Sequence, residues 1–329
     1  MKSEGLEEEF GFDYLILACG VQHSYFGRPD WEEFAPGLKT LEQATEIRRR
    51  ILSAFELAEN EMDKKKQESL MTFVIVGAGP TGVELAGAIA DISKTVLIHD
   101  FKRIDPSKAK VVLIEAGSRV LASFSESLSS QTEEALKTLG VEVRTSTRVK
   151  DINADGVQVE NEFISSRTVL WAAGVEASKM KIIPEVKKDR AGRITVKEDL
   201  SIEGFEDCFV IGDMASREIS LNRLVPGVAP AAIQMGKFVA NVIQTNSRRV
   251  FVYNDKGQMA TIGKHKAVMS FQNIESTGFI AWIAWLFIHI FYLIGFKNKL
   301  AVFFQWGWNY VLSKRGARLI ISKEWRKEI

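Results

Sequence analysis

A glycine-rich loop near residue 80 carries the clearest chemical signal in the sequence. The residues of this loop are Gly77, Ala78, Gly79, Pro80, Thr81 and Gly82. The three glycines have the G-x-G-x-x-G spacing, at which backbone N–H groups and a helix N-terminus can bind a dinucleotide pyrophosphate without obstruction by side chains. The apolar run 72–76 and the small residues of 83–91 supply the strand and the helix that the motif requires. All six loop residues are therefore candidates for cofactor binding.

An acidic residue at the end of the next apolar run indicates which dinucleotide binds. Glu115 ends the predicted strand 111–115, where a carboxylate can accept hydrogen bonds from the adenosine ribose but repels a 2′-phosphate. The sequence therefore predicts NADH in preference to NADPH. The polar insertion 93–110 makes the spacing from Gly82 to Glu115 longer than the motif usually shows. Arg119 lies close by in the sequence and leaves some tolerance of NADPH open.

Glu84 lies in the first turn of the predicted helix and has two alternative roles. An acid at this position can simply interact favourably with the helix dipole. It can also make a polar contact near the nicotinamide, which makes Glu84 a catalytic candidate. The residue pattern does not decide between these two roles.

The loop needs a sheet and helices to hold it, and the hydrophobic pattern predicts them. Strands are predicted at 12–18, 72–76, 111–115, 141–144, 168–171 and 208–211, with a small β element at 259–262 and 267–271. Helices are predicted at 41–60, 83–91, 126–139 and 226–243. The alternation of strands and helices from residue 72 onward is typical of a dinucleotide-binding domain. The charged run 62–68 is interpreted as an exposed linker, and residues 20–40 as irregular.

Composition and cysteine count exclude several classes of protein. Hydrophobic residues make up 46% of the chain, and 43 Lys and Arg nearly balance 42 Asp and Glu, which excludes a disordered chain or a nucleic-acid-binding arm. Two cysteines are too few for a disulfide framework, a structural zinc site or an iron-sulfur cluster. We therefore predict neither a metal site nor nucleic-acid binding, and a reducing compartment is the default.

Charge and aromatic residues are concentrated near the C-terminus. Residues 297–329 contain eight basic and two acidic residues, a net charge of +6, whereas residues 1–296 sum to −5. Five of the seven tryptophans lie from Trp282 onward. This asymmetry indicates contact with a membrane surface.

The apolar run 279–296 is uncharged over 18 residues, the short limit for crossing a bilayer. Gln305, Asn309 and Ser313 follow at spacings of four and predict one polar face on an otherwise apolar helix. We therefore expect a shallow anchor in the plane of the membrane, with a single membrane-spanning helix as the alternative.

Several stretches together resemble the type II NADH dehydrogenases. These stretches are TFVIVGAGPTGVELAGAIA (72–90), VVLIEAGSRVL (111–121), TVLWAAGVEAS (168–178), DLSIEGFEDCFVIGDMA (199–215) and PGVAPAAIQMGKFVA (226–240). The run 278–300 is similar to the membrane-anchoring end of that family. The resemblance implies an α/β fold with two Rossmann-like domains, in which NADH reduces FAD and the reduced flavin reduces a membrane quinone without proton pumping.

The resemblance also implies roles for individual residues. NADH would be bound by Gly77, Gly79, Gly82 and Glu115, with Ala173 and Gly174 passing close to it. Gly212 and Asp213 would bind FAD, Ala229 would cover its isoalloxazine, and Gln234 would act near flavin and quinone. Many family members have Ala-Gln where this chain has Ala229 and Pro230, so the polar quinone contact is either absent or supplied by Gln234.

The predicted domains follow from the same comparison. Residues 1–68 are predicted to be the end of the first FAD half with a linking helix, 69–180 the NADH-binding Rossmann domain, 181–248 the second FAD segment, and 249–329 a β element with membrane-anchoring amphipathic helices. The family's first G-x-G-x-x-G, which binds the adenosine half of FAD, does not occur before residue 72. We therefore expect an incomplete FAD domain, in a fragment or in a chain that another polypeptide completes.

The favoured function is a peripheral, monotopic NADH:quinone oxidoreductase on the cytoplasmic face of a membrane. Its expected partners are a membrane quinone and the lipid bilayer surface, with a homodimer as a further possibility. Two alternatives stay open: a sulfide:quinone reductase-like flavoprotein, and an inactive or fragmentary NADH-binding membrane module.

Overall fold

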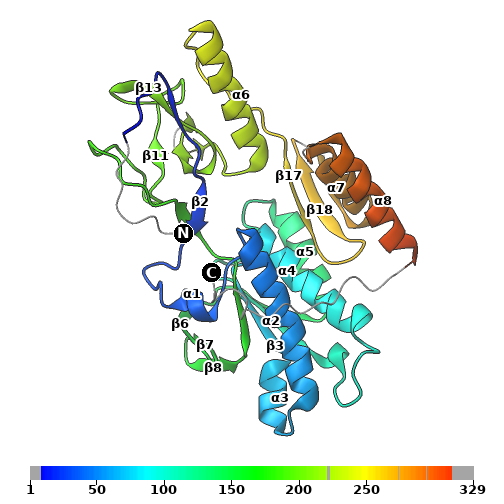
Figure 1. Cartoon of the computed structure of the whole chain (residues 1–329). Helices are drawn as coiled ribbons and strands as arrows, with labels where there is room; N and C mark the ends of the chain where they lie inside the picture. The colour runs from blue at the N-terminus through cyan, green and yellow to red at the C-terminus, as the bar shows by residue number, and fades with distance from the viewer. Residues whose placement is uncertain (1–8, 221–222, 273, 294, 313–329) are drawn as a thin grey trace. The chain divides into compact units, whose positions relative to one another are not determined.

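The computed structural model of the chain describes residues 9–220, 223–272, 274–293 and 295–312 (Figure 1). These residues form two compact units, each with its own hydrophobic core. Unit 1 combines the described residues of 1–23 with those of 175–256. Unit 2 combines residues 24–174 with the described residues of 257–329.

A four-stranded parallel sheet forms the centre of unit 2. Its strand order is β5 (Val141–Arg144), β4 (Lys110–Ile114), β3 (Thr72–Val76) and β9 (Thr168–Trp171). All five residues of β3 and all four of β9 are buried, as expected for parallel strands covered on both faces. The predicted strands 72–76, 141–144 and 168–171 are confirmed, and the strand predicted at 111–115 is shifted by one residue.

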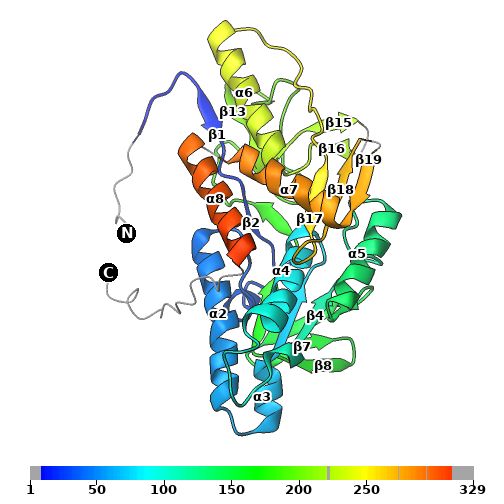
Figure 2. The same cartoon turned by 90° about the vertical axis from the view of Figure 1, so that its right-hand side faces the viewer.

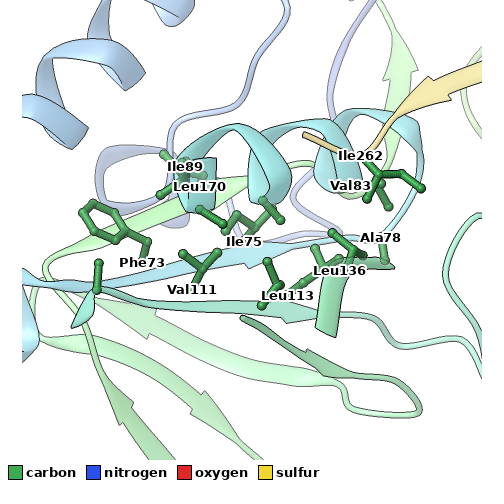
Figure 3. Close-up of a cluster of buried hydrophobic side chains, with 14 of the residues drawn as sticks. Phe73, Ile75, Ala78, Val83, Ile89, Val111, Leu113, Leu136, Leu170 and Ile262 are labelled. Carbon is green, nitrogen blue, oxygen red and sulfur yellow. The ribbon is translucent and has the colours of Figure 1, made fainter. Parts of the chain in front are cut away.

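Alternate side chains of the sheet pack into two different layers. On one face, Phe73 and Ile75 pack with Leu113, Leu170 and the buried side of α4 (Pro80–Asp91), as Figure 3 shows. The same core contains buried residues of α2 (Leu41–Asn60) and α5 (Glu126–Thr138). The other face, which includes Val74 and Trp171, packs on an antiparallel sheet of β6 (Val149–Asn153), β7 (Gly156–Val159) and β8 (Glu162–Ser165).

The first helices of unit 2 begin at side-chain caps. Thr40 and Gln43 form a capping box at the start of α2, whose bounds match the predicted helix 41–60. The run 62–68, which we interpreted as an exposed linker, instead contains the helix α3 (Lys64–Leu70). The prediction was wrong because the Asp63 carboxylate accepts hydrogen bonds from the backbone N–H groups of Lys65 and Lys66, so the charged run has its own N-cap. The short helix α1 (Trp31–Phe34) also lies in a stretch that we predicted to be irregular.

The insertion between α4 and β4 is only partly regular. It contains a π-helical turn at Ile92–Val96 and a 3-10 turn at Pro106–Lys108. Leu97 and Ile104 from this insertion are buried in the core of unit 2. The extra length before Glu115 is therefore packed against the domain.

Unit 2 contains a second antiparallel sheet, which follows residue 257 in the chain. Its order is β17 (Gln258–Thr261), β18 (Ala267–Phe271) and β19 (Ile274–Thr277). β17 packs on α4, and α7 (Gly278–Tyr292) packs on β18 and contacts α8 (Phe296–Leu312) (Figure 2). Within the described part of the chain, none of the helices combines the length and the apolar character needed to span a membrane.

Unit 1 is built around short strands and one long helix. β1 (Leu15–Leu17) runs parallel to β13 (Phe205–Val210), which pairs with β12 (Ser201–Ile202) on its other side. Three two-stranded pairs surround them: β2 (Val21–His23) with β10 (Val175–Ala177), β11 (Ile194–Thr195) with β14 (Ala215–Ser216), and β15 (Glu218–Ser220) with β16 (Arg223–Leu224). The helix α6 (Ala229–Thr245) buries Met235 and Val239 in the core. β1 is shorter than the predicted strand 12–18 because only Leu15–Leu17 pair with β13.

Candidate active site

A cavity of about 670 Å³ opens in unit 2 at the carboxyl ends of its central strands. Its lining includes Gly77 and Gly79 after β3, Glu115 after β4, and Ala173 and Gly174 after β9. Dinucleotides bind at the carboxyl edge of such parallel sheets. The structure thus brings five of the predicted cofactor-binding residues to one cavity.

The phosphate loop has no room for side chains at two of its glycines. Gly77 has a φ of +101°, and a Cβ there would lie 2.7 Å from the backbone of Ala172. A Cβ on Gly82 would lie 1.8 Å from the carbonyl oxygen of Gly77. Gly79 is different, since a Cβ there would meet no protein atom within 4 Å. Gly77 and Gly82 are therefore required for the shape of the loop, and the space above Gly79 is open to a ligand.

The remaining loop residues lie at the start of α4. Gly79 is the N-cap residue and Pro80 follows at the first helical position, with no side-chain hydrogen bond capping the helix. Pro80 and Thr81 are exposed, whereas Ala78 is buried. The helix therefore begins at the cavity with backbone N–H groups and no competing side-chain acceptor at the cap.

Glu115 joins the phosphate loop to the end of β4. Its Oε2 accepts a hydrogen bond from the Ala78 N–H at 2.7 Å, and its Oε1 accepts one from the Gly117 N–H at 2.7 Å. Arg119, which we considered a source of NADPH tolerance, instead donates to the backbone carbonyl oxygens of Phe124 and Ala122, both at 2.9 Å. The basic side chain that lines the cavity is a different one, which the sequence analysis missed.

That basic residue is Arg148, which is exposed and lies with Thr147 on the cavity lining. The Thr147 N–H donates to the Glu115 carbonyl oxygen at 2.9 Å, so the two segments are neighbours. Four aromatic residues of the lining were also missed: Tyr25, Phe26, Trp31 and Trp171. Three of them come from a stretch that the sequence analysis treated as irregular, and its aromatic content was the signal available for them.

Glu84 is not among the residues that line the cavity. Its Oε1 accepts a hydrogen bond from the backbone N–H of Thr261 in β17 at 3.1 Å. Burial raises the pKa of Glu84, and the hydrogen bond from Thr261 and the nearby His289 partly oppose this effect. In this structure Glu84 links α4 to the C-terminal sheet.

The other predicted site residues lie in unit 1. Gly212, with a φ of +70°, and Asp213 begin a 3-10 turn that is separated from β13 by Ile211 alone. This turn packs against the start of α6, where Ala229 is the first residue. The side-chain amide of Gln234 makes two hydrogen bonds with the backbone of Asn254. Its NH₂ group donates to the carbonyl oxygen and its oxygen accepts from the N–H, each at 2.9 Å.

Comparison with known proteins identifies the family of the chain. Residues 1–236 match the pyridine nucleotide-disulphide oxidoreductase family, and residues 256–314 match the NDH2 C-terminal domain. The chain is 41% identical over 329 residues to the type II NADH:quinone oxidoreductase Ndh of Mycobacterium tuberculosis, covering 95% of this chain and 70% of that protein. It belongs to the type II NADH dehydrogenases. The predicted family is confirmed.

Other type II NADH dehydrogenases extend this comparison. The enzyme of Staphylococcus saprophyticus is 31% identical over 268 residues, which cover 79% of this chain and 65% of that protein. The structure of NDH2 from Plasmodium falciparum in complex with NADH superposes with a TM-score of 0.85 at 19% identity, over 95% of this chain and 80% of that one. This likeness confirms the predicted α/β fold. The family is one of oxidoreductases that use FAD, NADH and quinone, as the sequence analysis expected.

Proposed function

We propose that the chain is an NADH:quinone oxidoreductase that binds NADH in the cavity of unit 2. The observation that carries this proposal is the convergence of the open space above Gly79, the start of α4 and the Glu115 carboxylate on one cavity. Backbone N–H groups at the start of α4 bind the pyrophosphate. Glu115 accepts hydrogen bonds from the adenosine ribose hydroxyls on the lone pairs that its two N–H donors leave available.

Unit 1 offers a place for FAD that fits the chemistry of its ribityl and pyrophosphate groups. Gly212 and Asp213 follow a strand of a parallel pair, and a Cβ on Gly212 would meet only Ala232, at 3.5 Å. The neighbouring α6 begins at Ala229 and has no side-chain hydrogen bond at its N-cap, Val228, so no side chain at the cap competes with a ligand for the Ala229 N–H. FAD supplies the redox chemistry that connects NADH to quinone. We assign Gly212, Asp213 and Ala229 to binding it.

The catalytic assignments follow the same proposal. Gln234 is assigned a place near flavin and quinone, although its amide bonds to the Asn254 backbone favour a positioning role. Glu84 is assigned a positioning role through α4, since its carboxylate bonds to Thr261. Neither assignment requires a titrating group on the chain, because the two-electron step belongs to the cofactors.

The exposed apolar side chains of α7 and α8 support attachment to a lipid surface, where the quinone is dissolved. The most exposed of them are Phe279, Ile280, Phe287, Phe291, Phe296, Phe304 and Trp308. An apolar surface of this kind marks a membrane or protein contact. We propose peripheral attachment on the cytoplasmic face, and a homodimer remains part of the proposal. Ser313 and most of the basic tail that we expected to face anionic lipid, residues 314–327, lie outside the described residues.

The function is tested with the purified chain, FAD, NADH and a short-chain quinone. We expect NADH to bleach the flavin absorbance and the quinone to restore it. Glu115→Ala should raise the KM for NADH with little effect on the KM for quinone, because it removes the ribose contact and the acceptor of the Ala78 and Gly117 N–H groups, all at the NADH cavity. Flavin that stays oxidised under excess NADH would contradict the proposal.

The same assay separates the two alternatives. Flavin reduction by sulfide in place of NADH would favour the sulfide:quinone reductase-like reading. A colourless chain that binds NADH but retains no FAD would favour an NADH-binding membrane module without its own activity. Glu115 lines the cavity, where its carboxylate can accept hydrogen bonds from the adenosine ribose. This position supports NADH as the electron donor.

A further inference from the structure

Residues 24–31 form a loop that is held firmly on both sides of one exposed aromatic side chain. On one side, Tyr25 is buried, and its ring lies 5.1 Å from that of Trp171. On the other side, Trp31 is buried, its ring lies 5.7 Å from that of Trp171, and its indole N–H donates to Oδ1 of Asp151 at 3.2 Å. The 24–31 loop is thus fixed to the sheet at both ends.

Phe26 lies between these two anchors in an uncommon conformation. Its φ is +51°, in the left-handed region that costs energy for a residue with a Cβ. Its side chain is 70% exposed, compared with 7% for Tyr25 and 5% for Trp31. Because most of the ring is exposed, burial in the core offsets only part of this cost. Side chains held in this way are concentrated at functional sites.

The ring of Phe26 lies at the wall of the NADH cavity. Phe26 and Gly174 both line the cavity. A Cβ on Gly174 would lie 2.5 Å from Cζ of Phe26, so the ring rests directly on the backbone of Gly174. The centre of the ring is 6.1 Å from that of Trp171. The backbone therefore supports one side of the ring, and the remainder is available to a ligand.

The order of the strands indicates which half of NADH reaches Phe26. Glu115 follows β4, Gly77 and Gly79 follow β3, and Gly174 follows β9, with β3 lying between the other two strands. When the adenosine ribose is at Glu115 and the pyrophosphate is at the phosphate loop, the nicotinamide half extends toward the end of β9. This is the end of the cavity at which the Phe26 ring rests on Gly174.

We propose that Phe26 binds the nicotinamide half of NADH and holds its ring by stacking. This inference rests on the proposed function and adds a binding residue to it. Planar heterocycles stack on aromatic side chains with a useful gain in affinity and a defined orientation. The ring contacts of Tyr25 and Trp31 with Trp171 keep the 24–31 loop in place when the ligand binds.

The test compares two ligands on variants of the full chain. NADH contains the nicotinamide half, and ADP-ribose lacks the nicotinamide ring but keeps the pyrophosphate and the adenosine. Binding of each is measured by isothermal titration calorimetry under anaerobic conditions on chains whose flavin has been reduced beforehand, so that NADH binds without transferring hydride. The variants are Phe26→Ala, Phe26→Gly and Phe26→Tyr, with Phe163→Ala as the matched control, because Phe163 is an exposed phenylalanine of β8 outside the cavity lining. Phe26→Gly also removes the left-handed strain, and thermal unfolding of each variant shows whether it is folded at the temperature of the titration.

We expect Phe26→Ala and Phe26→Gly to weaken NADH binding about tenfold. ADP-ribose binding should change by less than about twofold in the same variants, and Phe26→Tyr should retain most of the NADH affinity. Equal weakening of both ligands, or no change in either, would overturn the inference. A wild-type chain that binds neither ligand would instead overturn the proposed function, and the inference with it.

Discussion

The Glu84 carboxylate accepts a hydrogen bond from the backbone N–H of Thr261, which joins the nucleotide-binding helix to the C-terminal sheet. This bond lies inside unit 2 and away from the residues that line the NADH cavity. Glu84 is therefore better placed to hold two elements together than to contact the dinucleotide. The two roles predict different effects of substitution.

The first prediction concerns stability and pH. Burial raises the pKa of Glu84 above its usual value of 4.5, so the folded chain holds this proton more tightly than the unfolded chain does. The stability that this preference provides is present below pH 4.5 and is lost as the pH rises through the raised pKa of the folded state. Glu84→Gln keeps an acceptor for Thr261 but never ionises. In thermal unfolding, the melting temperature of Glu84→Gln should increase relative to that of the wild type as the pH rises from about 5 to about 8.

Glu84→Ala is the matched variant because it removes the acceptor as well as the charge. It should lower the free energy of unfolding by about 1–3 kcal/mol, since the Thr261 N–H loses its partner. NADH affinity should change little in Glu84→Gln. A large loss of NADH affinity with no change in stability would show that Glu84 contacts the dinucleotide instead.

The second prediction distinguishes a glycine that leaves space for the ligand, Gly79, from a glycine that the shape of the phosphate loop requires, Gly82. Gly79→Ala has room in the protein, and Gly79 has a φ of −70°, so its melting temperature should match that of the wild type. The added methyl group enters the space above the loop and should weaken NADH binding at least about tenfold. Gly82→Ala places a Cβ against the Gly77 carbonyl oxygen and should lower the melting temperature. Differential scanning fluorimetry measures the melting temperature of both variants, and calorimetric titration measures their NADH affinity. Equal losses of stability in Gly79→Ala and Gly82→Ala would contradict the different roles of the two glycines.

The third prediction concerns the choice between NADH and NADPH. Glu115→Gln removes the negative charge that faces a 2′-phosphate and should improve NADPH binding about tenfold. Adding Arg148→Ala should reverse much of that gain, because Arg148 is the arginine on the cavity lining. Adding Arg119→Ala should not reverse it, since Arg119 bonds to backbone carbonyls. Dissociation constants for NADH and NADPH are measured for each variant. If Arg119→Ala reversed the gain in NADPH binding and Arg148→Ala did not, Arg119 would be identified as the phosphate ligand.

The fourth prediction tests the membrane surface. Ile280 and Phe287 are exposed on α7, and replacing either with Asp should reduce sedimentation with lipid vesicles, because a charge cannot enter the apolar layer without cost. The double variant should lose binding about tenfold or more. Phe163→Asp introduces the same charge at an exposed phenylalanine of β8 and serves as the control. Unchanged vesicle binding in the double variant would assign the apolar surface to a protein partner.

The sequence predicted those parts of the fold in which a local pattern and a packed environment agree. The runs 72–76 and 168–171 are continuous apolar stretches, and both are fully buried strands of a parallel sheet. Helix 41–60 has apolar residues at helical spacing and a capping box at its start. In the same way, the glycine spacing together with the strand before it and the helix after it indicated the phosphate loop, and the short distances from Gly77 and Gly82 to neighbouring backbone allow only glycine at these two positions.

The features that the sequence did not predict depend on contacts between distant residues. Tyr25 and Trp31 pack on Trp171 from a stretch with no helical or alternating pattern, so no local rule indicated that they line the cavity. The sequence analysis named Arg119 because it is close to Glu115 in sequence, and it did not consider Arg148. Arg148 lines the cavity because β5 runs beside β4 and brings the residues that follow each strand together.

The spacing of Glu84, Gly87 and Asp91 along α4 gives this helix a second constrained face. A Cβ on Gly87 would lie 2.6 Å from the backbone nitrogen of Gly263, and the Asp91 carboxylate accepts a hydrogen bond from the Lys264 N–H. Positions three and four apart lie on one side of a helix, so this side of α4 is matched to the last residue of β17 and to the turn that follows it. In homologues, substitutions at these helix positions should therefore be tolerated mainly when the turn changes with them. The helix that begins at the phosphate loop and the C-terminal sheet are therefore constrained by each other.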